Sequence, residues 1–181
     1  MKKVIIGAIV GGLLLFVWQT VSWMVLDLHK NAHQYTDKQD EILANLSSQL
    51  TAEGQYFVPT VKPGATMDDR EAYMKQAEGK PWAIISYHKA MKIDMVTNII
   101  RGLLVNIVLV GLFCWILSKM NAPGFGTVFT ASLFVGLIVF MNGVYTAHIW
   151  YETFDLMAHL VDYLVGWGLA GLFLGWRFGK K

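Results

Sequence analysis

Hydrophobic residues fill four long windows of the chain, at residues 4–26, 99–117, 128–144 and 157–176. A transmembrane helix needs roughly 17–25 mostly apolar residues, and each window reaches that length. The first window follows MKK, as a signal peptide would, but its apolar run is longer than a usual h-region and no A-x-A-like cleavage site follows it. We therefore predict four transmembrane helices, the first being a retained anchor.

A more polar segment, residues 27–98, separates the first two windows. TDKQDEILANLSSQLTAEG predicts an amphipathic helix that Thr36 or Asp37 caps and Gly54 ends. Its apolar stripe consists of Ile42, Leu43, Leu46 and Leu50. QYFVPTV and WAIISYH predict two strands, and a second helix with Thr66 as N-cap lies between them. This αβαβ module has little core of its own, so we expect its apolar face to rest on the membrane part or on a partner.

Together these elements predict an all-α membrane protein, a four-transmembrane-helix bundle with a small α+β extracytoplasmic insertion between helices 1 and 2. The predicted parts are transmembrane helix 1 at residues 1–26, a periplasmic αβαβ module at 27–98, and transmembrane helices 2–4 with short loops at 99–181. Composition agrees, because a chain with 55% hydrophobic and 15% charged residues is too apolar for an ordinary soluble domain.

The short loops predict the orientation, because Lys and Arg favour the cytoplasmic side of a membrane. With the N-terminus inside, the inner segments carry no acidic residue. Their basic residues are Lys2, Lys3, Lys119, Arg177, Lys180 and Lys181. We therefore expect a multi-pass protein with both termini in the cytoplasm and the segment 27–98 on the outer side.

The charge argues against nucleic-acid binding, and the cysteine content excludes an intramolecular disulfide. The formal net charge of +2 is small, and no basic patch with interleaved aromatic residues occurs, which argues against a nucleic-acid partner. The single cysteine, Cys114, lies inside the second window, so no intramolecular disulfide can form.

Several stretches resemble a family of small four-span bacterial inner-membrane proteins. They are KKVIIGAIVGGLLLFVWQTVSWMVLDL, EGQYFVP, GKPWAIISYHK, and HIWYETFD followed by VDYLVGWGLAGLFLGW. The resemblance covers essentially the whole chain. It implies the architecture predicted above and a location in the bacterial inner membrane, and it carries no catalytic residues over to this sequence.

One polar residue of each window falls at the same depth, about 21–24 Å from the cytoplasmic boundary at 1.5 Å per residue. These residues are Gln19, Arg101, Asn142 and Asp162. Polar groups exposed to lipid are costly, so we expect the four to face one another, with Arg101 and Asp162 as an ion pair. Such a layer is either a set of contacts that hold the helices together or the lining of a proton, ion or ligand site.

HIWYETFDLMAHLVDY places further polar groups beside this layer. On a helix, Asp155, His159 and Asp162 are spaced i, i+4 and i+7 and share one face, which continues to the small residues Gly166 and Ala170. We expect His148 and Glu152 to belong to a short outer loop that bends over the same end of the bundle. The whole set is a candidate ligand site at the outer mouth of the bundle.

Imidazole and carboxylate groups together could ligate a metal such as Zn, Cu, Fe or Ni. His29 and His33, spaced i, i+4, could share a metal if the first helix continues past the membrane, and His148 and His159 are further candidates. No HExxH motif or cysteine cluster is present, so we expect no metal and predict no cofactor. Haem is disfavoured because the histidines lie near the surface. The Trp and Tyr residues indicate an interfacial aromatic belt, with a stacking site for a quinone or lipid headgroup as the alternative.

No nucleophile elbow, P-loop, Rossmann pattern or kinase signature occurs, so the sequence favours a non-enzymatic role. The leading hypothesis is a structural or accessory component of a larger membrane assembly. It would contact the lipid bilayer and a protein partner or second copy, through the transmembrane helices or the outer module. The alternative is a small transporter or a ligand- or metal-binding protein whose site includes Arg101, His159 and Asp162. A pocket that reaches these side chains would favour the alternative, because a purely structural layer should be dry and fully paired.

The first window also contains GAIVGG, in which Gly7, Gly11 and Gly12 form a face of small residues. Such a face allows another helix to approach closely. The sequence leaves open whether that helix belongs to the same chain or to another.

Overall fold

A computed structural model describes residues 1–180, so Lys181, counted above among the cytoplasmic residues, lies outside the described part. The chain forms two compact units. The helical unit contains Met1–Gln34 and the chain from Asp94 onward, and the small unit is Tyr35–Ile93. Residues 27–34, which the sequence placed in the outer module, belong to the helical unit instead.

The helical unit contains four helices long and apolar enough to cross a membrane. Three are α1 (Lys2–Met24), α4 (Met95–Lys119) and α7 (Leu156–Phe178). The fourth runs over Phe125–Trp150 and is built from α5 (Phe125–Val139), the π-helical segment η1 (Phe140–Tyr145) and α6 (Thr146–Trp150). The four predicted windows are therefore confirmed as long apolar helices.

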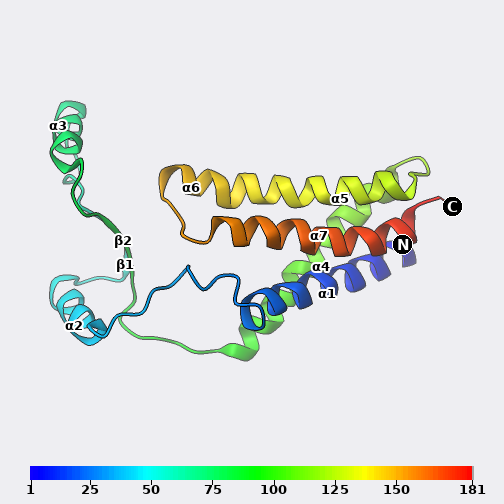
Figure 1. Cartoon of the computed structure of the whole chain (residues 1–181), viewed down its shortest axis with the longest axis horizontal. Coiled ribbons are helices and arrows are strands. Elements are labelled where there is room, and N and C mark those ends of the chain that lie inside the picture. The colour runs from blue at the N-terminus through cyan, green and yellow to red at the C-terminus, as the bar shows by residue number, and fades with distance from the viewer. Residues whose placement is uncertain (181) are drawn as a thin grey trace. The chain divides into compact units, whose positions relative to one another are not determined.

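Helices α1 and α7 pack together at the centre of the helical unit (Figure 1). Helix α4 packs on α1, and α5 packs on α7, whereas α4 and α7 have little contact. The shared core includes Leu15 of α1, Val110 of α4, Val128 of α5 and Leu174 of α7. Consequently α1 lies between α4 and α7 over much of its length.

The face of small residues on α1 packs against another helix of the same chain, α4. A Cβ atom on Gly12 would lie 2.6 Å from the backbone Cα of Ile107 in α4, and one on Gly11 would lie 2.7 Å from Val110 Cγ1. Both distances are well below van der Waals contact, so only glycine allows α4 to approach this closely. On α7, a Cβ atom on Gly166 would lie 3.0 Å from Leu15 Cδ2 and 3.3 Å from Trp18 Cδ1, so α1 approaches closely here too, as the sequence predicted for this position.

Both ends of the helical unit's chain lie on one side of the unit (Figure 1). The Lys180 backbone N–H donates to the Pro123 carbonyl at 2.9 Å, which joins the end of the chain to the α4–α5 turn. The Lys3 Nζ atom lies 5.2 Å from the centre of the Phe178 ring. The α6–α7 loop and the connections to the small unit both lie at the other ends of the helices, away from the two termini.

The small unit has the predicted order of elements, α2 (Gln39–Gln49), β1 (Gly54–Val58), α3 (Met67–Ala77) and β2 (Ala83–Tyr87). The strands form an antiparallel pair in which Tyr56 lies opposite Ile85. Thr66 caps α3 as predicted, and it forms a reciprocal capping box with Asp69. Tyr87 is the only buried residue of this fully described unit, in keeping with its expected lack of a core.

The ends of α2 differ from the prediction. Lys38, rather than Thr36 or Asp37, precedes the first helical residue, and Gly54 begins β1 instead of ending the helix. The Thr36 hydroxyl accepts a hydrogen bond from the Lys38 backbone N–H at 3.2 Å, so it stabilises the turn before the helix.

Candidate functional site

A buried histidine lies where α1 turns toward α7. Helix α1 ends at Met24, and a turn held by the Leu28 N–H to Ser22 carbonyl hydrogen bond of 3.1 Å brings His29 against the start of α7. The His29 side chain is only 1% exposed. Its ring stacks on Trp23, with ring centres 3.9 Å apart and planes 5° from parallel. The ring is therefore fixed in position and orientation.

Each nitrogen of the His29 ring faces an aspartate, one at the N-cap of α7 and one within α7. Nδ1 lies 2.7 Å from Asp155 Oδ2, and Nε2 lies 3.0 Å from Asp162 Oδ2. Asp155 directly precedes α7, and Asp162 lies seven residues further along the chain, within the helix. One imidazole therefore bridges two carboxylates, and it donates to both of them when it is protonated.

His159 and Thr153 complete this cluster around Asp155. His159 Nε2 lies 3.3 Å from Asp155 Oδ2, and its ring meets the His29 ring edge-on at 4.7 Å. The Thr153 hydroxyl donates to Asp155 Oδ1, and the Thr153 backbone N–H donates to His148 Nδ1 at 3.1 Å. The polar cluster is defined as His29, Asp155, His159 and Asp162. Asp155, His159 and Asp162, which the sequence placed on one face, all lie against the His29 ring.

The environment of Asp155 favours its ionised form. Burial raises the pKa of this carboxyl, but the hydrogen bonds from His29 and Thr153, together with the positive charge that His159 and His29 can carry, outweigh burial. The net result is a pKa below the usual range for aspartate. Asp155 is therefore a carboxylate at neutral pH.

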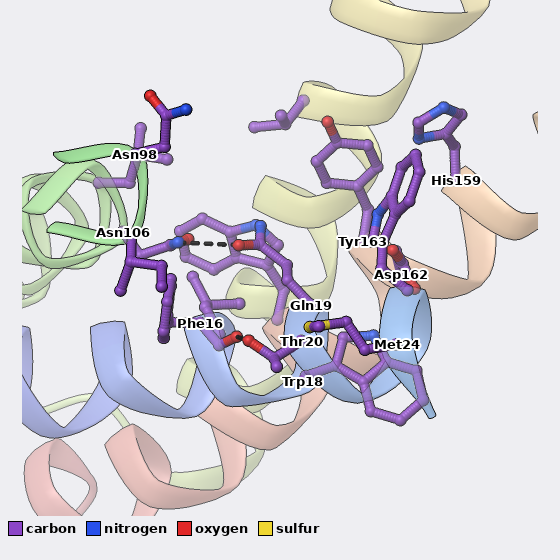
Figure 2. Close-up of a pocket in the computed structure, with 16 residues that line it drawn as sticks. Phe16, Trp18, Gln19, Thr20, Met24, Asn98, Asn106, His159, Asp162 and Tyr163 are labelled. Carbon is purple, nitrogen blue, oxygen red and sulfur yellow. Dashed lines mark hydrogen bonds between the residues drawn. The ribbon is translucent and has the colours of Figure 1, made fainter. Parts of the chain in front are cut away.

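A cavity of about 460 Å³ lies beside the polar cluster, between α1, α4 and α7. Figure 2 shows Gln19 of α1, Asn106 of α4, and His159, Asp162 and Tyr163 of α7 around it. The Asn106 Nδ2 atom donates to Gln19 Oε1 at 2.9 Å across one wall. The aromatic side chains that line the cavity are Phe16, Trp18, Trp23, Tyr163 and Trp167.

Two buried polar atoms that belong to residues lining this cavity have no hydrogen-bond partner within residues 1–180. They are Asp162 Oδ1, an acceptor, and Trp18 Nε1, a donor. A buried polar atom without a partner costs roughly 1–3 kcal/mol, so native proteins usually satisfy such atoms with protein groups, water or a ligand. One acceptor and one donor therefore lie unpaired in side chains that form the wall of the cavity.

The predicted four-residue polar layer does not form. Arg101 is exposed and makes no ion pair with any described residue, whereas Asp162 is bound by His29. Gln19 pairs with Asn106, and Asn142 is exposed on η1. Depth along a helix fixes height but not the direction in which a side chain points, and α1 stands between α4 and α7. The predicted Arg101–Asp162 ion pair is therefore wrong.

The other predicted candidates divide into two groups. His29 and His159 join the cluster, but His33 does not. Helix α1 ends before His29, so His29 and His33 do not share a helical face despite their i, i+4 spacing. His148 contacts the cluster only through Thr153. Glu152 is exposed and has no ion pair among the described residues.

Thr153 and Asn106 were not predicted as site residues. A threonine two positions before an aspartate is a weak signal for the hydroxyl hydrogen bond that it makes here. A lone asparagine inside an apolar window could have marked Asn106, since such a residue usually needs a partner on another helix.

Comparisons of the chain with protein-family models, with curated proteins and with solved structures found no match. The resemblance to small four-span bacterial inner-membrane proteins stays a prediction from the sequence.

Proposed function

We propose that this chain is an integral membrane protein that binds a small organic cation in the cavity between α1, α4 and α7. The observation that carries the proposal is the Asp162 carboxylate, which lines the cavity and is 10% exposed. Its Oδ1 atom is buried and without a partner. A ligand that donates a hydrogen bond to this oxygen would satisfy it.

Charge favours a cationic ligand. When His29 is protonated, two carboxylates and one imidazolium leave the centre of the polar cluster with a charge of −1. The aromatic rings around the cavity offer faces that attract an ammonium group, and such contacts contribute about 0.5–2 kcal/mol when the cation is desolvated. Trp18 Nε1 additionally suits a ligand with an acceptor oxygen near its ammonium group.

The same features speak against a purely structural role for these polar residues. Contacts that only hold helices together should be dry and fully paired, whereas here a cavity reaches His159 and Asp162 and two buried polar atoms are unpaired. The alternative hypothesis from the sequence therefore has the stronger support, with Asp162 and His159 in the site and Arg101 outside it.

We also propose that the four long helices cross the bacterial inner membrane with both termini in the cytoplasm. The support comes from their length and hydrophobicity and from the basic residues near the shared end of the helices. In this topology the ligand cavity lies toward the outer half of the bilayer, because the residues that line it come mainly from the parts of α1, α4 and α7 distant from the termini.

Binding of benzylammonium to the full-length protein in detergent tests the ligand proposal. After a chelator has removed metal ions, we expect a saturable change in tryptophan fluorescence, because Trp18, Trp23 and Trp167 line the cavity. Asp162→Asn should abolish the change, while Glu152→Gln, which alters an exposed carboxylate outside the cavity, should retain it. Circular dichroism checks that the Asp162→Asn variant is folded. A response that is equal in the wild type and in folded Asp162→Asn, or absent from both, would exclude the proposal.

Arg101 supports a second candidate function, that of a component of a larger membrane assembly. It is exposed on an apolar helix and has no ion-pair partner in residues 1–180, so a carboxylate on a partner helix would satisfy it. Native gels of the detergent extract test this idea. We expect a complex larger than the monomer that Arg101→Gln weakens, and a wild-type chain that migrates as a monomer would contradict it.

A further inference from the structure

The geometry points to a binding site for a divalent transition-metal ion of the zinc class, formed by His29, Asp155 and His159. One ligand atom from each residue lies within 4.8 Å of the other two. This inference goes beyond the proposed function, because neither His29 nor Asp155 lines the organic-ligand cavity.

The donor atoms suit such an ion. Two imidazoles and one carboxylate are a common ligand set for zinc and related metals, and three protein ligands leave a position open for water or another ligand. In a tetrahedral site with bonds near 2.0–2.1 Å, ligand atoms lie about 3.3 Å apart. His159 Nε2 and Asp155 Oδ2 already have this separation, 3.3 Å. His29 Nδ1 lies 2.7 Å from the same oxygen, so this pair must widen by about 0.6 Å.

The groups behind the donors are those that a metal site requires. Metal-binding histidines usually donate their second ring N–H to a carboxylate or carbonyl, which fixes the tautomer. Here His29 Nε2 faces Asp162 Oδ2 at 3.0 Å, so a proton on Nε2 leaves the Nδ1 lone pair directed toward Asp155. The Thr153 hydroxyl donates to the other oxygen of Asp155 and so holds that carboxylate in place.

Burial and access also fit a metal. His29 and Asp155 are fixed in the interior, with side chains 1% and 3% exposed, whereas His159 is 27% exposed and lines the cavity. His159 therefore connects the site to the cavity, from which an ion can enter. A divalent ion balances the charges of Asp155 and Asp162, and if His29 is doubly protonated its Nδ1 proton leaves to solvent when the metal binds.

Metal loading of the full-length protein in detergent tests the inference. The protein is stripped with EDTA, loaded with Co²⁺, passed through a desalting column and examined by elemental analysis and visible absorption. We expect stoichiometric Co²⁺ with the intense bands of a tetrahedral ion, and displacement of these bands by Zn²⁺. Asp155→Asn and His29→Gln should lose the bound ion. The matched control His33→Gln, a histidine close in sequence but outside the cluster, should keep it.

A milder variant covers the case in which these replacements prevent folding. Thr153→Val removes only the hydroxyl that supports Asp155, and loss of such support typically weakens metal affinity about 10- to 100-fold. Three results would each overturn the inference: substoichiometric metal in the wild type, unchanged metal content in a folded Asp155→Asn variant, or unchanged metal affinity in Thr153→Val. The benzylammonium response of metal-free protein is a separate measurement, so the two proposals can fail independently.

Discussion

His29 joins two distant parts of the chain through one side chain. It contacts Trp23 of its own segment and Asp155, His159 and Asp162 of the α7 segment, and 126 positions separate it from Asp155. The His29 ring lies between the carboxylates of Asp155 and Asp162, so the two negative charges do not face each other directly. The end of α1 is thereby held against the start of α7.

Replacement of His29 by leucine should be strongly destabilising. Breaking a buried ion pair by removal of one partner typically costs roughly 3–5 kcal/mol, because the other charge remains buried without compensation. The double variant His29→Leu/Asp155→Leu should melt at a higher temperature than His29→Leu alone, since it removes one of the two stranded carboxylates. Thermal unfolding of metal-free protein in detergent measures both. Equal melting temperatures for the wild type and the two variants would show that the cluster contributes nothing to stability.

At this scale the sequence predicted only those site contacts that lie within one helix. The i, i+4, i+7 spacing placed Asp155, His159 and Asp162 together because helix geometry alone decides it. The position of His29 depends on how the chain turns after α1, which no local pattern specifies. The partner of Asp162 was therefore predicted wrongly as Arg101, because position along a helix does not give the direction in which a side chain points.

Helices α1 and α4 pack so closely that glycine positions control their contact. Gly11 and Gly12 face Val110 and Ile107, and at Gly12 the neighbouring atoms belong to the backbone of α4 and cannot rotate away. The pattern GAIVGG predicted a close helix contact correctly, but the choice of partner helix is a tertiary property. The same contact positions Gln19 opposite Asn106 on one wall of the cavity.

Gly12→Ala should therefore destabilise the helical unit. Its new Cβ atom would lie 2.6 Å from Ile107 Cα, and overpacking of this kind typically costs about 1–3 kcal/mol. Gly126→Ala in α5 is the matched control, because nothing lies within 4 Å of its Cβ position and alanine is the better helix former. Thermal unfolding in detergent should show a lower midpoint for Gly12→Ala only. A midpoint as high as that of Gly126→Ala would mean that α4 can move away at no cost.

The capping box of α3 makes the start of this helix sensitive to acid. Hydrogen bonds from the Thr66 side chain and backbone N–H lower the pKa of the Asp69 carboxyl. Because the folded-state pKa lies below the unfolded value, which is about 4, the stabilisation is complete above that value and is lost as the pH falls through the folded pKa.

Thr66→Ala should raise the Asp69 pKa toward its ordinary value and destabilise α3 by about 0.5–2 kcal/mol. An NMR titration of the Asp69 carboxyl carbon in the full-length protein measures the first effect, and limited proteolysis within α3 reports the second. Asp94 is an internal reference, since its pKa is lowered by Thr97 and should not respond to the substitution. An unchanged titration of Asp69 would contradict the role of Thr66.

At the scale of the whole chain, the number and order of elements follow from periodicity, because long apolar windows and short alternating segments differ strongly. The boundary between the units was less predictable. Residues 27–34 are polar enough to resemble the outer module, but His29 ties them to the helical unit. The amino-acid composition shows that this segment is polar, but the boundary between the units depends on which residues the segment contacts.

The proposed topology predicts which cysteines react with a membrane-impermeant thiol reagent. Thr66→Cys should react in intact cells, because this residue is exposed at the start of α3 in the outer module. Lys119→Cys, at the end of α4 on the side of the termini, should react only after the membrane is permeabilised. Cys114 is fully buried and should stay silent in both conditions, which makes the natural chain a suitable background. Reaction of Lys119→Cys alone in intact cells would invert the topology.

The π-helical segment η1 determines the direction in which the side chains of α6, the next part of the same helix, point around the helix axis. Each α-helical residue advances the chain by about 100°, and a π turn holds one residue more than an α turn, so α6 is rotated from the direction that an uninterrupted α5 would give it. His148 lies three residues beyond η1 and receives the Thr153 N–H, while the Thr153 hydroxyl holds Asp155. Removing one residue from η1 would turn His148 away from Thr153. Thr153 would then lose one of the contacts that position it, and its hydroxyl would hold Asp155 less firmly.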